Sequence, residues 1–378
     1  MNNRIYQRCT RCVMDTTDSK ISFDENGVCD HCRNFDKNIA PYWKPAENRF
    51  DELEKVAEKI RIGGKNREYD CILGLSGGAD SSYLAYIAKE IMHLRPLVYV
   101  VDTGWNLNVA VENIEKIVKG LNLDMYTDVI NWKEMRDLQL AYFKSGISSQ
   151  DFPQDHAIFS SMYNYAVKHG IKYILTGSNS ATEFIRSPVE WIYMNDLRMA
   201  KDIHKKFGTI PLKTYPTCGI LRYRIWYKYF KGMKRVYPLD YVVYDKAKAE
   251  QFLNEKYGWT KYKNKHFENV FTRFFEGYYL PTKFGYDTRK NVLSNEILAG
   301  TKTREEALEI LSKPPYDLSQ ALKDKTYVAK KLGISTDEFD SIIKDENKTP
   351  DDYKNSFWMI KLGVWFCKLL GIENRNIR

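Results

Sequence analysis

The sequence predicts an α/β protein with a doubly wound parallel sheet, preceded by a metal-binding ribbon and followed by a mostly helical region. Two Cys-x-x-Cys pairs lie within the first 32 residues, apolar strands alternate with helical patterns from Tyr69 to Gly177, and strand signals fade after about residue 215. Repeated strand and helix alternation is typical of parallel sheets, which bind ligands at the carboxyl ends of their strands. We therefore expect three domains, at residues 1–45, 46–215 and 216–378.

The strands and helices of the predicted sheet follow one another in order. A predicted helix over Asp51–Ile62 precedes them. Between Leu107 and Leu121, apolar residues recur at the three- and four-residue spacing of one helix face. The predicted strands are Asp70–Leu75, Pro96–Asp102, Leu123–Ile130 and Ile171–Gly177. The predicted helices between them are Asp80–His93, Leu107–Leu121, Trp132–Phe143 and His156–His169.

The C-terminal third carries helix signals in place of strand signals. Thr303 to Glu306 and Ser335 to Glu338 have the spacing of capping boxes. The segment Leu221–Met233 interleaves basic and aromatic residues, which predicts an amphipathic helix, with nucleic-acid or membrane-surface contact as the alternative. The apolar stretch Phe357–Ile372 contains two lysines and is too short to cross a bilayer, so a packed or interface helix is expected there.

Bulk properties narrow the function without fixing it. The chain has 378 residues and 43% hydrophobic content, enough for a large core. A net charge of +9 suits a protein that handles polyanions, although charges of both signs dilute this signal. No apolar stretch of signal-peptide length lies at the N-terminus, and we expect a cytoplasmic protein with no transmembrane segment.

The cysteine pairs predict a closed metal site. Cys9, Cys12, Cys29 and Cys32 form C-x2-C-x16-C-x2-C, a spacing of four-cysteine zinc ribbons, and an Asn26-Gly27 turn can fold the second pair beside the first. We assign these four thiolates to a structural Zn²⁺. An iron–sulfur cluster is the alternative, and His31 is expected to point away from the metal.

A glycine-rich loop follows the first predicted strand. Ser76, Gly77, Gly78, Asp80, Ser81 and Ser82 occupy the turn between this strand and a helix. Glycines let the backbone approach an anion closely, and the helix start supplies free N–H groups. A carboxylate beside a phosphate is repulsive unless a divalent cation lies between them, so Asp80 predicts bound Mg²⁺.

The sequence Ser-Gly-Gly-x-Asp-Ser resembles the signature of the PP-loop ATP pyrophosphatases. The resemblance implies ATP cleavage between the α- and β-phosphates, with Asp80 and Ser81 acting in catalysis. It also implies that two further strand ends hold the adenosine. These are Asp102-Thr103 and Thr176-Gly177-x-Asn179, with Glu183 beyond.

Together with the ribbon that opens at Arg8-Cys9-Thr10-Arg11-Cys12, the loop resembles the N-acetyl sugar amidotransferases of this superfamily most. Segments Lys265–Phe274 and Lys283–Arg289 are also similar to that group. The resemblance implies an N-acetylated, nucleotide-linked sugar as substrate, whose acetamido oxygen is adenylated and replaced by ammonia in bacterial surface polysaccharide or flagellar glycan synthesis. Lys283 and Arg289 are candidate cations for the departing pyrophosphate, or else solvated surface charges.

The chain shows no glutaminase nucleophile, because Cys71, Cys218 and Cys367 lie outside any G-x-C-x-G motif. The resemblance therefore implies partners, namely a glutaminase subunit and an ammonia-channelling barrel subunit like those of imidazole glycerol phosphate synthase. Nucleic acid is not expected as a partner. Two rival functions remain, a tRNA-modifying PP-loop enzyme and a non-enzymatic zinc-ribbon binding protein.

Overall fold

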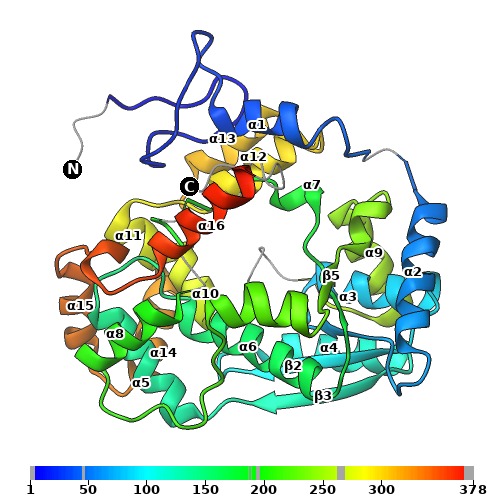
Figure 1. The fold of residues 1–378 in the computed structure, drawn as a ribbon. Coiled ribbons are helices and arrows are strands. Elements are labelled where there is room, and N and C mark those ends of the chain that lie inside the picture. Colours follow the sequence, from blue (N-terminus) through cyan, green and yellow to red (C-terminus); the bar gives the residue numbers. More distant parts are fainter. Residues whose placement is uncertain are drawn as a thin grey trace.

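The computed structural model describes residues 5–44, 47–185, 187–188, 190–192, 196–261 and 269–369. Its centre is a sheet of five parallel strands in the order β3-β2-β1-β4-β5 (Figure 1). The strands are β1 Cys71–Gly74, β2 Pro96–Asp102, β3 Asp124–Val129, β4 Tyr173–Leu175 and β5 Lys234–Val236. The predicted doubly wound sheet is confirmed. The family-like segment 265–268 lies outside the described residues.

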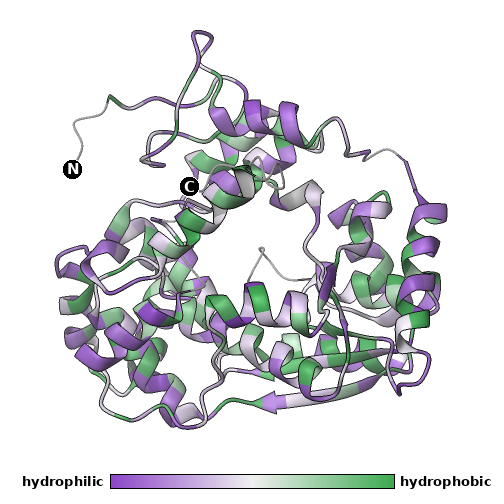
Figure 2. Cartoon of the chain, viewed as in Figure 1, coloured by the Kyte–Doolittle hydropathy of each residue, from purple (hydrophilic) through white to green (hydrophobic). Residues whose placement is uncertain are grey.

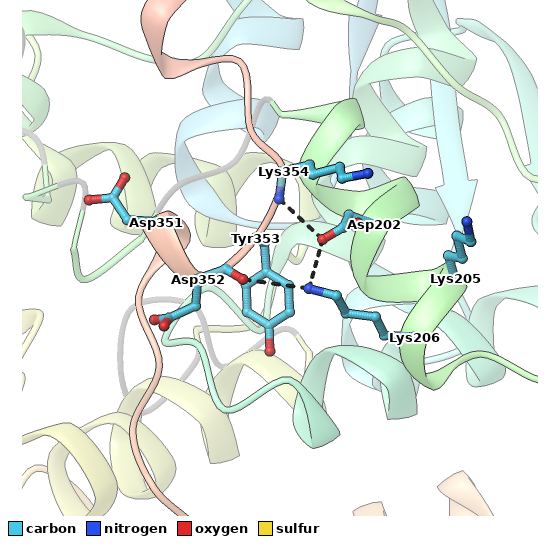
Figure 3. Close-up of a pocket in the computed structure, with 7 residues that line it drawn as sticks. All are labelled: Asp202, Lys205, Lys206, Asp351, Asp352, Tyr353 and Lys354. Atoms are coloured by element: carbon cyan, nitrogen blue, oxygen red, sulfur yellow. Dashed lines mark hydrogen bonds and ion pairs between the residues drawn. The ribbon is translucent and has the colours of Figure 1, made fainter.

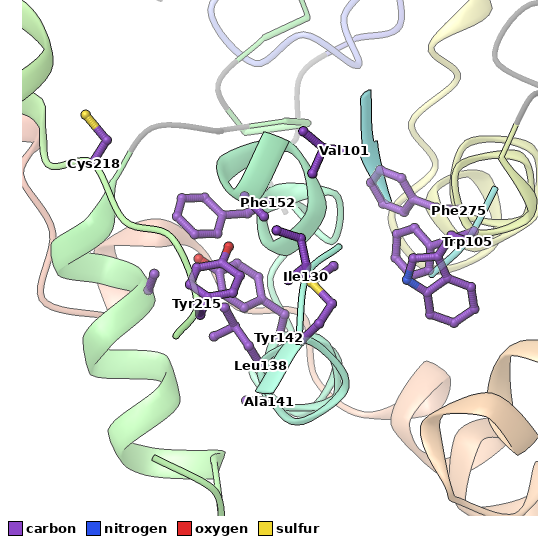
Figure 4. Close-up of a cluster of buried hydrophobic side chains, with 14 of the residues drawn as sticks. Val101, Trp105, Ile130, Leu138, Ala141, Tyr142, Phe152, Tyr215, Cys218 and Phe275 are labelled. Atoms are coloured by element: carbon purple, nitrogen blue, oxygen red, sulfur yellow. The ribbon is translucent and has the colours of Figure 1, made fainter. Parts of the chain in front are cut away.

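Helices cover both faces of the sheet because alternate strand residues point to opposite sides. One face, with Leu73 and Val98, packs against α2 Phe50–Gly64, α3 Ala79–Tyr86, α4 Asn108–Gly120 and α9 Lys246–Tyr257. The other face, with Ile72 and Tyr99, packs against α5 Trp132–Lys144, α6 Phe152–Lys168 and α8 Leu197–Phe207. Figure 4 shows part of this second core, where the rings of Tyr142 and Phe152 stack 5.1 Å apart.

The sequence did not predict β5. Its three residues, Lys234, Arg235 and Val236, contain a single aliphatic side chain, so no apolar run marks the strand. Its backbone pairs with β4, and Thr176 N–H donates to the Val236 carbonyl at 3.1 Å. The sheet therefore extends past residue 215, into the region that was expected to be mostly helical.

Beyond the sheet the described chain is mostly helical, as predicted. The helices there are α10 Val270–Phe274, α11 Leu280–Phe284, α12 Arg289–Leu298, α13 Arg304–Ser312, α14 Leu318–Leu332, α15 Thr336–Lys344 and α16 Phe357–Leu369. Short helices of two other types lie between these elements. The π-helices are η1 Ile87–Ile91, η2 Arg222–Phe230 and η4 Phe275–Tyr279, and the 3₁₀-helices are η3 Pro238–Tyr241 and η5 Pro350–Asp352. Thr303 and Glu306 form the predicted capping box, and Ser335 accepts from the Glu338 amide.

The N-terminal ribbon packs on the C-terminal helices (Figure 1). It contains α1 Asp30–Asn38 and the predicted Asn-Gly turn, in which Gly27 has a positive φ of 75° and lies against Thr10. Lys290 of α12 forms an ion pair with buried Asp15 at 2.6 Å, and Arg304 of α13 donates to the Cys9 carbonyl at 2.9 Å.

In the described part of the chain, every helix is too short or too polar to span a membrane.

Candidate active site and metal site

The glycine-rich loop lies where predicted, between β1 and α3. Gly77 has φ of 82°, and a β-carbon there would lie 2.5 Å from the carbonyl oxygen of Ala110 in α4, so only glycine fits. The hydroxyl groups of Ser76 and Ser81 are 3.2 Å apart across the loop. Gly78 is the N-cap of α3 and offers no side chain to the first-turn amides, which leaves these donors for an anion.

Two buried side chains hold the loop from outside the predicted motif. The indole Nε1–H of Trp259 donates to the Gly77 carbonyl at 2.8 Å, and the amide of Asn113 approaches the same carbonyl at 3.5 Å. Asn113 also exchanges hydrogen bonds with the backbone of Thr260, at 2.8 and 2.9 Å. No local sequence signal marks these residues, because Trp259 is 182 positions away from Gly77 along the chain.

The end of β4 closes against the loop. A β-carbon on Gly177 would lie 3.1 Å from the backbone of Asp80 and Ser81, so glycine permits the approach of the two segments. Asn179 donates to the Gly177 carbonyl at 3.2 Å, and Ser178 N–H donates to the Thr176 hydroxyl at 3.3 Å. The structure thus brings together the loop and the strand end that the resemblance assigns to adenosine.

The end of β2 adjoins β1 and forms a tight turn. Asp102 accepts a hydrogen bond from the Gly104 amide at 2.8 Å, and Thr103 is buried. Gly104 has φ of 85° and packs against the Trp132 ring. Asp102 and Thr103 therefore lie at the same sheet edge as the loop, since parallel neighbours end together.

Asp80 is held by a residue that the sequence did not predict. The phenol of Tyr244, which is mostly buried, donates to Oδ1 of the Asp80 carboxylate. Burial and then the Asp80 charge raise the pKa of Tyr244, so this phenol remains a donor. Among the hydrogen bonds of the described residues, Oδ2 of Asp80 has no partner, and a carboxylate oxygen is the type of ligand that Mg²⁺ takes. The residues present therefore fit a cation here.

Glu183 follows the strand end that faces the loop. It ends the short helix α7 Ser180–Glu183, which packs on α12, and its side chain is exposed.

Lys283 and Arg289 contact helix ends in the structure, and their role toward pyrophosphate stays a prediction. Lys283 Nζ donates to the Ile342, Ile343 and Asp345 carbonyls at 2.6–3.0 Å, at the C-terminal end of α15. Arg289 forms an ion pair with Asp287 at 2.7 Å and donates to carbonyls at the end of α13. A cation at a helix C-terminus is stabilised by the exposed carbonyls. Sequence spacing cannot reveal this, because the receiving carbonyls lie 21 to 62 residues away.

A buried polar cluster begins α6, and the composition of Ser148–His156 alone suits either a substrate-holding loop or an inert surface loop. Gln154 donates to Asp151 and to Thr272, both at 2.7 Å, and accepts from Asn269 at 2.9 Å. The stretch Ser148–Asp151 is buried, so an inert surface loop is excluded. Because α6 runs between β3 and β4 in a parallel sheet, its first turn lies at the carboxyl edge of the strands.

Burial raises the pKa of Asp155, in this first turn, to about 7. Burial, together with the charges of Asp155 and Glu276, also raises the pKa of Asp151. Carboxyl groups with raised pKa values are typical of functional sites. Asp151 and Asp155 are therefore candidate site residues in addition to those that the sequence predicted.

The four predicted cysteines form one cluster. Cys9, Cys12, Cys29 and Cys32 are fully buried, and their sulfur atoms all lie within 4.8 Å of one another. Three of the sulfur–sulfur separations, at 3.6 to 3.9 Å, are close to the edges of about 3.8 Å in a tetrahedron with metal–sulfur distances of about 2.3 Å. The thiolates therefore fit a single tetrahedral ion. His31 pairs instead with Asp18 at 2.8 Å.

A polar depression lies away from these sites, between α8 and η5 (Figure 3). Its residues are Asp202, Lys205, Lys206, Asp351, Asp352, Tyr353 and Lys354. Asp202 forms an ion pair with Lys206 at 2.9 Å and accepts from the Lys354 amide at 3.1 Å. These contacts join α8 to the segment after η5, and no predicted site residue lines the depression.

Several known proteins resemble the chain. An uncharacterised protein of Methanocaldococcus jannaschii is 28% identical over 179 residues, which are 45% of this chain and 58% of that protein. The chain thus spans little more than half the length of this curated relative. NH3-dependent NAD synthetase from Campylobacter jejuni is 21% identical and has a TM-score of 0.26, over 35% of this chain and 58% of that chain.

Two further solved structures match more of the chain. NMN synthetase from Francisella tularensis is 14% identical over 60% of this chain and 100% of its own, with a TM-score of 0.28. The U34-tRNA thiolase NcsA from Methanococcus maripaludis, with its [4Fe-4S] cluster, is 13% identical over 91% of both chains, with a TM-score of 0.32.

The C-terminal region matches a family directly. Residues 268–364 match the family described as "LPS biosynthesis protein WbpG-like, C-terminal domain". This range holds the helices α10 to α15 and most of α16. The match of residues 268–364 to a family of lipopolysaccharide-biosynthesis proteins fits the resemblance to the N-acetyl sugar amidotransferases of the PP-loop superfamily.

Proposed function

We propose that the chain is an ATP-dependent amidotransferase of lipopolysaccharide or related glycan biosynthesis. Its substrate is an N-acetylated, nucleotide-linked sugar, whose acetamido group becomes an acetamidino group. The observation that carries the proposal is the loop from Ser76 to Ser82 at the carboxyl edge of a parallel sheet, joined to a WbpG-like C-terminal domain in one chain. The loop supplies anion-binding amides, and the family match supplies the biosynthetic context.

The proposed chemistry has two steps. The acetamido oxygen attacks the α-phosphorus of ATP, the bond to the β-phosphate breaks, and pyrophosphate leaves. Ammonia then adds to the activated carbon, the bond from this carbon to the adenylate oxygen breaks, AMP departs, and nitrogen loses a proton. Mg²⁺, when bound, would neutralise charge on the phosphates.

The chain's own residues take the binding and orienting roles. The first-turn amides of α3 and the hydroxyls of Ser76 and Ser81 bind phosphate oxygens. Asp80 holds the cation, and the hydrogen bond from Tyr244 orients the Asp80 carboxylate. The strand ends at Asp102-Thr103 and Thr176-Gly177 are assigned to adenosine. We assign the buried polar cluster at the start of α6 to the sugar, because it lies at the same edge.

Ammonia comes from a separate glutaminase through a barrel subunit in this proposal. Burial raises the pKa of Cys218 to about 11 and that of Cys71 well above its usual value, so neither thiol is activated for nucleophilic attack. The Cys367 side chain is outside the described part of the structure. Zn²⁺ in the four-cysteine site is assigned a structural role.

The test is a reaction of the purified chain with Mg-ATP, an N-acetylated nucleotide sugar and excess ammonium salt. The expected products are AMP, pyrophosphate and a sugar whose mass is lower by about 1 Da, because NH replaces O. Glutamine in place of ammonium should give no product until the glutaminase and barrel proteins are added.

Other outcomes distinguish the rivals. Formation of ADP and phosphate would exclude adenylation. Modification of tRNA without modification of any sugar would establish the tRNA enzyme instead, and absence of ATP cleavage with every acceptor would favour a binding protein.

A further inference from the structure

The helix η2 projects its apolar side chains into solvent. An amphipathic helix was expected here, with its apolar face covered, but within η2 only Tyr227 is buried. It is anchored by a hydrogen bond from its phenol to Asn164. The large apolar side chains around it are 45 to 69% exposed, namely Leu221, Ile225, Trp226, Tyr229 and Phe230. Exposed apolar groups in such number on one short segment indicate a contact surface.

The same segment carries a concentrated positive charge. Between Ile203 and Leu239 the sequence has nine Lys and Arg residues and no Asp or Glu, and this count equals the net charge of the whole chain. Arg222, Arg224, Lys228 and Lys231 are exposed on η2 or directly after it. This stretch is therefore locally positive, which favours attraction to anionic surfaces.

The helix α16 exposes a second apolar stripe. Its large side chains at positions 358, 362, 365, 366 and 369 share one face by helical spacing, and all are more than half exposed: Trp358, Leu362, Trp365, Phe366 and Leu369. Lys361 is exposed beside them, and no acidic residue occurs in the helix. Figure 2 shows hydrophobic and hydrophilic residues mixed along α16.

We infer that η2 and α16 are two membrane-docking elements that bind the face of an anionic phospholipid bilayer. Tryptophan, tyrosine and phenylalanine mixed with Lys and Arg are typical of elements that lie in the interface between headgroups and acyl chains. The positive charge complements anionic headgroups, and the helices are too short to span the bilayer. This inference does not depend on the proposed reaction.

The aliphatic side chains favour a bilayer over RNA. Aromatic and cationic groups alone would suit stacked bases and phosphates. Leu362 and Leu369 on α16, and Ile225 on η2, are about half or more exposed, and an aliphatic group has no flat ring on which a base can stack. Insertion among acyl chains removes such groups from water.

The test measures co-sedimentation of the full chain with vesicles. Vesicles of phosphatidylglycerol and phosphatidylethanolamine should bind the chain, vesicles of phosphatidylcholine should bind it weakly, and added NaCl should release it. Charge reversal by Arg224→Glu with Lys228→Glu should weaken binding to the anionic vesicles about tenfold or more. The matched control reverses two exposed lysines on α2, Lys55→Glu with Lys59→Glu, and should bind nearly as the unchanged chain does.

A second pair tests the apolar contribution. Leu362→Ser with Leu369→Ser should weaken binding several-fold, while Leu318→Ser with Leu322→Ser, two exposed leucines on α14, should not. Circular dichroism and thermal melting confirm that each variant is folded. Equal binding to both vesicle types, equal loss in test and control pairs, binding to an RNA oligomer but not to vesicles, or a stable dimer that α16 substitutions dissociate would each overturn the inference.

Discussion

At the scale of single residues, Asp80 and Tyr244 form the pair on which ATP use should depend. Asp80→Ala should abolish pyrophosphate release at every Mg²⁺ concentration, because no carboxylate remains for the cation. Tyr244→Phe removes only the phenol that orients Asp80, so it should raise the Mg²⁺ concentration needed for half-maximal release several-fold and leave activity at high Mg²⁺ largely intact. Magnesium titrations of pyrophosphate release by folded variants check this. Identical titrations for Tyr244→Phe and the unchanged chain would show that the phenol has no orienting role.

Asp155 predicts a pH dependence of stability. Burial raises the pKa of this carboxyl to about 7, whereas it is near 4 in the unfolded chain. The folded state therefore keeps the proton longer, and stability is lost as the pH rises from about 4 to about 7. Asp155→Asn cannot ionise, so its free energy of unfolding should exceed that of the unchanged chain by a few kcal/mol, at most about 4, at pH 8 and differ little at pH 4.

Urea denaturation at both pH values measures this difference. Glu115→Gln on the exposed side of α4 is the matched control and should shift neither value. A gain for Asp155→Asn that is equal at the two pH values would exclude the ionisation account.

At the scale of elements, the ribbon should depend on its metal. The two Cys-x-x-Cys turns place four buried thiols within 4.8 Å of one another, and without a metal these four thiols lose the ligand that joins the two turns. Cys29→Ser should reduce the yield of folded protein before it affects turnover per folded molecule. Elemental analysis should find one Zn²⁺ per chain. Iron with sulfide, or well-folded protein with no metal, would contradict the assignment.

At the scale of the whole molecule, hydrogen bonds join the ribbon to α13 and to the segment after β4. Arg304 donates to the Cys9 and Cys12 carbonyls at 2.9 and 3.2 Å, and Trp191, after β4, donates to the Thr17 carbonyl at 3.1 Å. Chelation of the metal should therefore lower the main melting temperature of the full chain by several degrees. A metal that binds only the folded state stabilises every part of the chain that unfolds together with its site. Calorimetry with and without chelator measures the shift.

Arg304→Ala should reduce this shift, because the guanidinium couples the cysteine turns to α13. The exposed Arg11, whose side chain pairs with Asp36, provides the comparison, and Arg11→Ala should leave the shift nearly unchanged. A separate low-temperature transition for the ribbon in the unchanged chain, with no shift in the main one, would show that the two parts unfold independently.

The sequence by itself determined the local elements of this protein. Apolar runs bounded by turn residues marked β1 to β4, and the spacing of cysteines and of the glycine loop marked both candidate sites, because each signal is contained in a short stretch of chain. The short, basic strand β5 carries no such pattern and was missed.

Only the tertiary structure decided which distant residues meet. Trp259 and Tyr244 reach the loop from 182 and 164 residues away, Lys283 and Arg289 turn to helix ends, and the first turn of α6 is buried at the sheet edge. The tertiary structure also decided which apolar side chains are exposed to solvent. The aromatic side chains of η2 and α16 are apolar, but no other part of the described fold covers most of them. Contacts between distant segments depend on how helices and strands pack, and a single sequence does not record that packing.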